Sequence, residues 1–158
     1  MQTSILIPLG GKPSSMAALR RARGIAQCEH SRLYLLHVVE PKMVKDILKA
    51  DAEAQAHGLD DEDYARAEAF LEGCWQRLNE PMAAVNFLIK GGKVLDTIAE
   101  EACRLKVDAV ILGTSKKDSE REGFLDKVKK TLPCKFTVVD EEENTVLEHS
   151  PSRSSCWL

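Results

Sequence analysis

Two glycines followed by the start of a helix form the segment of the chain that is best suited to chemistry. Gly10 and Gly11 come directly after an apolar run, and Lys12, Pro13 and Ser14 lead into an amphipathic stretch. Glycines at such a place let backbone N–H groups approach an anion at the helix N-terminus. The segment is not a Walker A loop, because it lacks that motif's glycine spacing and its Ser or Thr after the lysine. It predicts either an anion-binding loop or a plain glycine turn.

The other reactive side chains do not form a catalytic set. His37 lies within an apolar run, which is typical of a packed core histidine, and Cys134 has no neighbour that would activate it as a nucleophile. No Ser/His/Asp or Cys/His combination falls together at the expected strand ends. The chain also lacks the acidic residues that a phospho-receiver domain needs after its first and third strands. We therefore expect a protein that is not an enzyme and holds no metal.

The composition is that of an ordinary globular domain. The chain has 158 residues, of which 44% are hydrophobic and 30% are charged, and its formal net charge is −3. The apolar fraction excludes disorder throughout, and no apolar run reaches the roughly 18 residues of a membrane helix. The charge gives no electrostatic basis for binding nucleic acid. Five cysteines without a C-x-x-C pair fit neither a disulfide scaffold nor a zinc site, so we expect a reduced, cytoplasmic domain.

Apolar runs and helical stretches alternate over the first 140 residues. Uninterrupted apolar runs favour strands that are covered on both faces, as in parallel sheets. Their alternation with helices predicts an α/β fold with a five-stranded, parallel, doubly wound sheet of the flavodoxin or Rossmann type, in which strand one is central. Ligands bind such sheets beyond the carboxyl ends of the strands. The strands are expected at residues 4–9, 33–39, 85–89, 107–112 and 136–139.

Two polar regions carry no further site. Residues 141–158 begin with acids and end in a serine-rich stretch, which predicts a disordered tail after a domain spanning residues 1–140. In the first helix, Arg20, Arg21 and Arg23 lie outside the apolar stripe, and we expect them to form a solvated face.

Taken together, these patterns resemble the universal stress protein family over about residues 1–140. The resemblance rests on residues 5–8 with the glycine turn and helix that follow, on residues 35–39, and on residues 133–139. Residues 94–114 are similar to that family's approach to its nucleotide loop. The resemblance implies a five-stranded parallel fold of the adenine nucleotide alpha hydrolase type. It also implies a regulatory or protective role under stress, with ATP or another adenine nucleotide bound in some members.

The ATP-binding members of that family carry Gly-x-x-Gly, nine residues and then Gly-Ser/Thr. By spacing, Gly113 fills the first position, Lys116 and Asp126 replace the next two glycines, and Lys127 replaces the Ser or Thr. The Asp that such members place after strand one falls on Gly10. The resemblance therefore predicts a degenerate site that binds ATP or AMP weakly. The candidate nucleotide- or anion-binding residues are Gly10, Gly11, Val39, Gly113, Thr114, Lys116, Lys127 and Val128.

Three functions are compatible with these residues. The first is a universal stress protein that acts through contacts with another protein, whose identity the sequence does not give. The second binds an adenine nucleotide or another small anion in an altered way, through Gly10, Gly11, Lys116 and Lys127. The third is a nucleotide hydrolase or transferase, for which the sequence shows no convergent acid–base pair.

The resemblance also implies a homodimer. Strand Phe136–Val139 is expected at an edge of the sheet, where its backbone N–H and C=O groups have no partner. Pairing with the same strand of a second copy would satisfy these groups, and the family often dimerises in this way. We therefore expect a homodimer through Phe136–Val139.

Overall fold

The computed structural model describes residues 3–10, 12–29, 31–40, 61–77, 85–114 and 118–150 of the chain. Helices and strands alternate along these residues until the last two strands, which follow each other directly. The elements, in chain order, are β1 (Ser4–Pro8), α1 (Pro13–Glu29), β2 (Arg32–Val39), α4 (Asp61–Gln76), β3 (Val85–Gly91), α5 (Val94–Leu105), β4 (Ala109–Gly113), α6 (Asp118–Thr131), β5 (Phe136–Val139) and β6 (Thr145–His149).

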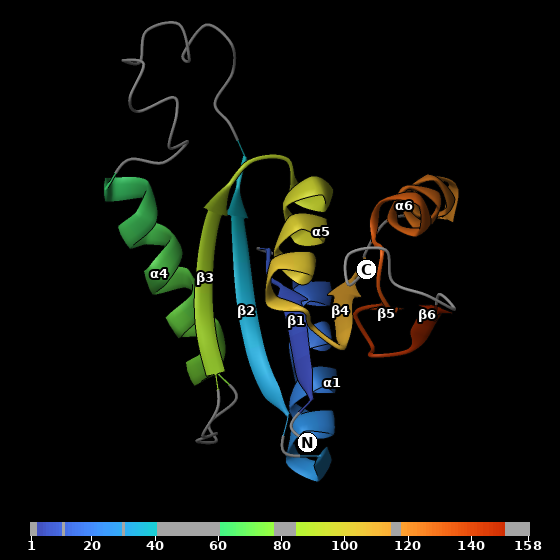
Figure 1. Ribbon diagram of the computed structural model, residues 1–158, viewed down its shortest axis with the longest axis horizontal. Coiled ribbons are helices and arrows are strands. Elements are labelled where there is room, and N and C mark those ends of the chain that lie inside the picture. Colours follow the sequence, from blue (N-terminus) through green and yellow to red (C-terminus); the bar gives the residue numbers. More distant parts are fainter. Residues whose placement is uncertain are drawn as a thin grey trace, which may run out of the picture.

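One sheet holds these six strands in the order β3-β2-β1-β4-β5-β6 (Figure 1). β1 pairs in parallel with β2, from Ser4 opposite Arg32 to Pro8 opposite Leu36, and with β4 on its other side. The β2–β3 and β4–β5 pairs are also parallel, whereas β6 runs antiparallel to β5. The predicted parallel α/β fold with β1 inside the sheet is confirmed, and a sixth strand is added to it.

The apolar side chains of the strands alternate between two cores, one on each face of the sheet. Ile5, Ile7 and Leu35 pack on the face covered by α1 and α4, whereas Leu6 and Leu36 pack on the face covered by α5 and α6. Figure 1 shows α5 in front of the sheet and α1 behind it. Because successive side chains of a strand point to opposite faces, a strand covered on both sides needs a continuous apolar run.

The covering helices follow from ordinary sequence signals. α4 begins with Asp61, Glu62 and Asp63, whose negative charges are favourable at the positive end of the helix dipole. α5 buries Ile98 and Ala102, which lie four residues apart on one face of the helix. The position of each helix over the sheet thus depends on a short apolar stripe.

The stretch that was expected to be a disordered tail contains a strand. A turn at residues 140–144 reverses the chain, and β6 then pairs with β5 from Phe136 opposite His149 to Val139 opposite Thr145. The prediction of a disordered tail over residues 141–158 is therefore wrong for β6. Sequence reasoning missed this strand because it is short and has polar residues at both ends. Residues 151–158 lie outside the part of the chain that the structure describes.

The sixth strand also changes the edge of the sheet. β5 pairs with β4 on one side and with β6 on the other, so it is not an edge strand. The expected homodimer through Phe136–Val139 assumed an unpaired edge at this strand. That assumption is wrong, because β6 fills the place that the second copy was expected to occupy.

The arginines of α1 are not only a solvated face. Arg20 Nε lies 3.3 Å from Glu143 Oε1 in the turn before β6. Arg21 donates hydrogen bonds to Thr145 Oγ1, at 3.0 Å, and to the backbone carbonyl of Glu143. Arg20 is exposed, as predicted for a solvated face, but both arginines also join α1 to the hairpin.

Within the described part of the chain, no helix has the length and apolar character needed to cross a membrane. The His, Cys, Asp and Glu side chains of the same residues do not gather into a group of three that could hold a metal ion. Burial raises the pKa of the free thiol of Cys74, although the charge of Arg77 opposes the shift. A protonated thiol is a poor nucleophile, so Cys74 acts as a core residue.

Candidate functional site

The strand order reverses between β1 and β4, and the fold leaves room for a ligand there. β1 leads into α1 on one face of the sheet, whereas β4 leads toward α6 on the other. Backbone hydrogen bonds also join neighbouring strands at this end of the sheet. The Leu9 N–H donates to the Leu36 carbonyl and the Thr114 N–H to the Val139 carbonyl, both at 2.8 Å. In an open parallel sheet the crevice at such a reversal is the usual place for a ligand.

A cavity of about 840 Å³ lies at these strand ends. The ends of β1, β2 and β4, the first turns of α1 and α5, and one side of α6 line it. Ile98, Leu112 and Phe124 give the lining an apolar part, and Ser14 and Thr114 contribute hydroxyl groups. Its size falls within the roughly 300–1,000 Å³ of small-molecule sites. A ligand the size of a nucleotide would fit.

The loop between β1 and α1 uses its own polar groups to close the turn. The Gly10 N–H donates to Ser15 Oγ at 2.9 Å, and the Ser15 N–H donates to the Lys12 carbonyl at 3.0 Å. The backbone N–H of Gly10 thus already has a partner inside the protein. This arrangement favours the plain glycine turn over an anion-binding loop at Gly10.

The last residue of β4, Gly113, has to be a glycine because α1 packs directly against it. A Cβ added there would lie 2.2 Å from the Ser14 carbonyl oxygen and 2.8 Å from the Ser14 Cβ. These are atoms of the first turn of α1, so a flexible side chain cannot simply move away from the clash. Gly113 therefore allows α1 to rest against the end of β4, which shapes one wall of the cavity.

Charges of both signs surround the cavity. Lys12, from the loop before α1, and Lys127, on α6, bring positive charge, whereas Glu40, after β2, and Glu120, on α6, bring negative charge. The formal charges of these four side chains cancel. The described lining residues therefore give the cavity no excess of positive charge that would attract a polyanion such as a nucleoside triphosphate.

His37 lines the cavity but is held by the protein itself. Its Nδ1 lies 2.9 Å from the Leu9 carbonyl oxygen, and its ring centroid lies 4.8 Å from that of Phe70 on α4. Since a carbonyl only accepts, Nδ1 carries the proton in this bond. The interpretation of His37 as a packed histidine agrees with these contacts.

Comparison with known proteins identifies the family that has this fold. A family model described as the universal stress protein family matches residues 1–140. The chain belongs to the universal stress protein family. No curated protein sequence matches it.

Solved structures of universal stress proteins share this fold. The chain is 22% identical to UspA from Lactobacillus plantarum, with a TM-score of 0.65 over 86% of this chain and 96% of that one. It is 16% identical to an Arabidopsis thaliana member determined with AMP bound, with a TM-score of 0.58 over 87% and 91%. It is 15% identical to an Archaeoglobus fulgidus member in complex with dAMP, with a TM-score of 0.58 over 89% and 97%.

The structure places the residues predicted for the universal stress protein site in four different ways. Val39 ends β2, where its carbonyl accepts the Gly92 N–H at 3.1 Å, and it is not among the described residues that line the cavity. Val128 is fully buried in the core beneath α6, so its side chain cannot contact a ligand. Gly11 and Lys116 lie outside the described residues. Those that line the cavity are Gly10, Gly113, Thr114 and Lys127.

The positions that match Gly-Ser/Thr of the ATP-binding members lie inside a helix. α6 begins at Asp118, so Asp126 and Lys127 come well after its first turn. Backbone N–H groups in a helix interior donate to carbonyls of the preceding turn, and only those of the first turn remain for a phosphate. In this chain the two positions therefore lie where the backbone N–H groups are already bonded within the helix.

Several residues around the cavity were not among the predicted binding residues. Lys12 and Glu40 belong to the loops after β1 and β2, so their position could have been expected from the strand ends. Glu120 and Phe124 reach the cavity only because α6 covers it, and no motif in the sequence indicates that placement.

Proposed function

We propose that this universal stress protein acts in the stress response through contacts with another protein and binds adenine nucleotides only weakly. The observation that carries the proposal is the position of Asp126 and Lys127 within α6. A phosphate loop needs backbone N–H groups that are free to donate, and an α-helix interior has none. The proposal keeps the family fold and assigns a reduced role to the nucleotide.

The charges of the cavity support weak binding of ATP in particular. Lys12 and Lys127 would attract the phosphates, but Glu40 and Glu120 in the same lining would repel them. Gly10 stands where ATP-binding members carry the Asp for the ribose, so that hydrogen-bond acceptor is missing as well. The negative charges disfavour the triphosphate more than a less charged ligand, whereas the missing acceptor weakens the binding of every ribonucleotide.

A second proposal is that the cavity binds an adenine monophosphate or a similar small anion in an altered way. It is supported by the open volume of about 840 Å³ and by two lysines in the lining, Lys12 from the loop before α1 and Lys127 from α6. Relatives determined with AMP or dAMP show that the family fold accepts monophosphates. In this alternative the lysines take the place of the missing backbone donors.

A catalytic role is not part of either proposal. General acid–base catalysis needs a group that is positioned to move a proton at the reacting atom. The histidine of the cavity, His37, already bonds through Nδ1 to Leu9. We propose that the protein is not an enzyme and that its output is a contact with a partner protein.

Isothermal titration of the full chain with AMP and with ATP tests these proposals. We expect dissociation constants weaker than about 100 μM for both, corresponding to less than about 5.5 kcal/mol of binding free energy. Lys127→Ala should then change the affinity little, as should the control Lys130→Ala on the exposed side of α6. Low micromolar AMP binding that Lys127→Ala weakens at least about tenfold, while Lys130→Ala does not, would replace the first proposal with the second.

A further inference from the structure

We propose that a second cavity, between α1 and α4, binds a small organic anion, meaning one phosphate or carboxylate group carried on an apolar body. The volume of this α1–α4 cavity is about 320 Å³, at the lower end of the range for small-molecule sites. Its described lining shares only Gly10 and Lys12 with that of the strand-end cavity. The inference therefore does not rest on the proposed nucleotide site.

The apolar part of the α1–α4 cavity comes from both helices. Met16 of α1 and Phe70 of α4 are half-buried and pack against the core on this face of the sheet, and Cys74, one turn after Phe70, is buried. The ring of Phe70 also contacts His37, with the two centroids 4.8 Å apart. An aromatic or aliphatic group of a ligand would cover these side chains and remove their apolar surface from water.

Cationic side chains from three segments belong to the same lining. Lys12 precedes α1, Arg20 lies within α1, and Arg77 directly follows α4. Glu141, in the turn before β6, is the one acidic residue among the described lining residues, so positive formal charges exceed negative ones by two. In the strand-end cavity the formal charges cancel. The two cavities therefore favour different ligands, and the α1–α4 cavity favours an anion.

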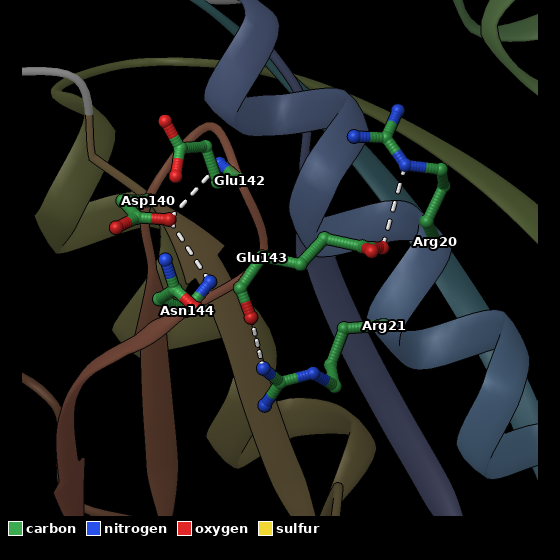
Figure 2. Close-up of polar contacts among 6 residues, drawn as sticks. All are labelled: Arg20, Arg21, Asp140, Glu142, Glu143 and Asn144. Carbon is green, nitrogen blue, oxygen red and sulfur yellow. Dashed lines mark hydrogen bonds and ion pairs between the residues drawn. The ribbon is translucent and has the colours of Figure 1, made fainter.

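These cations have donors to offer a ligand. Within the described part of the chain, neither the Lys12 ammonium group nor the Arg77 guanidinium group has a hydrogen bond or an ion pair. Arg20 pairs with Glu143 through Nε, at 3.3 Å, and Figure 2 shows its two terminal nitrogens directed away from that carboxylate. Cations that line one cavity repel one another, and a bound anion reduces that repulsion.

The charge of Arg77 acts on the floor of the cavity. Burial raises the pKa of the Cys74 thiol, and the positive charge of Arg77 opposes that rise. The guanidinium group is therefore close enough to Cys74 for its charge to be felt there. An anion that rests on Phe70 and Cys74 would lie within reach of the same charge.

The turn before β6 places the competing carboxylate, that of Glu141. One carboxylate oxygen of Asp140 accepts the backbone N–H groups of Glu142 and Asn144, each at 2.9 Å, as Figure 2 shows. The Glu143 N–H donates to the Asp140 carbonyl at 3.1 Å. Because these bonds fix the backbone on both sides of Glu141, its carboxylate stays in the lining and opposes the binding of an anion.

The combination of an apolar floor and an excess of cations determines the class of ligand. Inorganic phosphate would pair with the cations but leave Met16 and Phe70 in contact with water. A neutral aromatic molecule would cover those side chains but leave the cations without a partner. Guanidinium groups bind carboxylate and phosphate in the same bidentate way, so the proposal includes both groups.

The test titrates the full chain with phenyl phosphate and with benzoate and follows its backbone amides by NMR. Inorganic phosphate, which lacks the apolar body, and benzyl alcohol, which lacks the charge, are the control ligands. We expect the two probes to shift the amides of Met16 and Phe70 more than those of Thr114 and Phe124, which line only the strand-end cavity. Their dissociation constants should be about 1 mM or tighter. Those of the control ligands should be at least about fivefold weaker.

Two substitutions should change the affinity for phenyl phosphate in opposite directions. Arg77→Ala removes a cation and should weaken binding at least about threefold, whereas Glu141→Gln removes the opposing charge and should strengthen it about twofold. Arg66→Ala, on α4 but outside the described lining, removes the same charge as Arg77→Ala and should have no effect. All three side chains are exposed, so we expect each variant to fold.

Three results would overturn the inference. The first is that neither probe shifts the amides of Met16 and Phe70. The second is that Arg77→Ala weakens binding no more than Arg66→Ala does, and the third is that inorganic phosphate or benzyl alcohol binds as tightly as the probes. A failure of the proposed nucleotide function would be distinct, because AMP or ATP bound in the strand-end cavity would shift the amides of Thr114 and Phe124.

Discussion

The strand-end cavity and the β5 edge differ in one respect: the cavity is open, whereas the edge is covered by the chain itself. The cavity is open, and the family residues expected to hold a nucleotide there are replaced or lie inside α6. The edge is closed by β6, by the Asp140 turn and by two arginines of α1. The cover of the edge combines β6, which follows the family domain, with Asp140 and two arginines that belong to it. One sheet thus has an open end and a covered edge.

The largest effect is expected at the cavity wall, from Gly113→Ala. The added methyl group would meet the Ser14 carbonyl oxygen at 2.2 Å, and α1 would have to move away from β4. We expect a loss of about 3 kcal/mol in the free energy of unfolding, the upper part of the range for overpacking. Urea denaturation measures this loss.

Gly123→Ala is the matched control for that substitution. A Cβ at Gly123 would meet nothing within 4 Å, and the residue lies in the interior of α6. Alanine there should stabilise the protein by about 0.5–1 kcal/mol, because it favours the helix more than glycine does. A loss below about 1 kcal/mol for Gly113→Ala would contradict the close contact between α1 and β4.

A smaller effect is expected at the closed edge, from Asp140→Asn. Hydrogen bonds from the backbone, first that of Asn144 and then that of Glu142, lower the pKa of Asp140, and Arg121 adds to the shift. The unfolded chain therefore holds this proton at pH values where the folded chain has lost it. The stabilisation is complete above the ordinary aspartate pKa and is lost as the pH falls through the lowered pKa of the folded state.

Unfolding midpoints measured from neutral to acidic pH test this expectation. Asp140→Asn should lower the midpoint slightly at neutral pH, because a neutral amide accepts the two N–H groups more weakly than a carboxylate does. The difference from the natural chain should disappear in acid. Glu141→Gln, at an exposed position of the same turn, should show no such convergence. A constant difference at every pH would mean that the Asp140 carboxylate does not fasten the turn.

The fold was largely predictable because strands buried on both faces leave a strong signal. The runs around Ile5, Leu35 and Ile111 are continuous and apolar, and the helices between them make parallel pairing the simplest arrangement. β6 gave no comparable signal. It has one covered face and an outer edge, and its apolar residues, Val146 and Leu147, follow each other instead of alternating.

The location of the candidate site could be predicted from the sequence, but the residues that line it could be predicted only in part. The strand order locates the cavity, and Gly113, Thr114 and Lys127 are among its lining residues; that they bind a ligand stays a prediction. The sequence could not show that the helix holding Asp126 and Lys127 begins as early as Asp118. It also could not show that Val128 turns into the core, since that depends on how α6 packs on the sheet.

The most direct test of weak nucleotide binding compares the natural chain with one that carries the family's residues. The restored variant has Gly10→Asp, Lys116→Gly, Asp126→Gly and Lys127→Ser. A Cβ at Gly10 would lie an ordinary 3.7 Å from Ser15 Oγ, so the first change fits. The last two disfavour the helix and would free backbone N–H groups for the phosphates. Lys129→Ser with Lys130→Ser, at exposed α6 positions outside the described cavity lining, is the control.

Isothermal titration with ATP gives the comparison. We expect the restored variant to bind ATP at least about tenfold more tightly than the natural chain, a gain of about 1.4 kcal/mol, and the control to show no gain. A natural chain that already binds ATP at low micromolar concentration, together with a restored variant that binds no better, would contradict the account. It would show that the lysines of this protein form a working nucleotide site of their own.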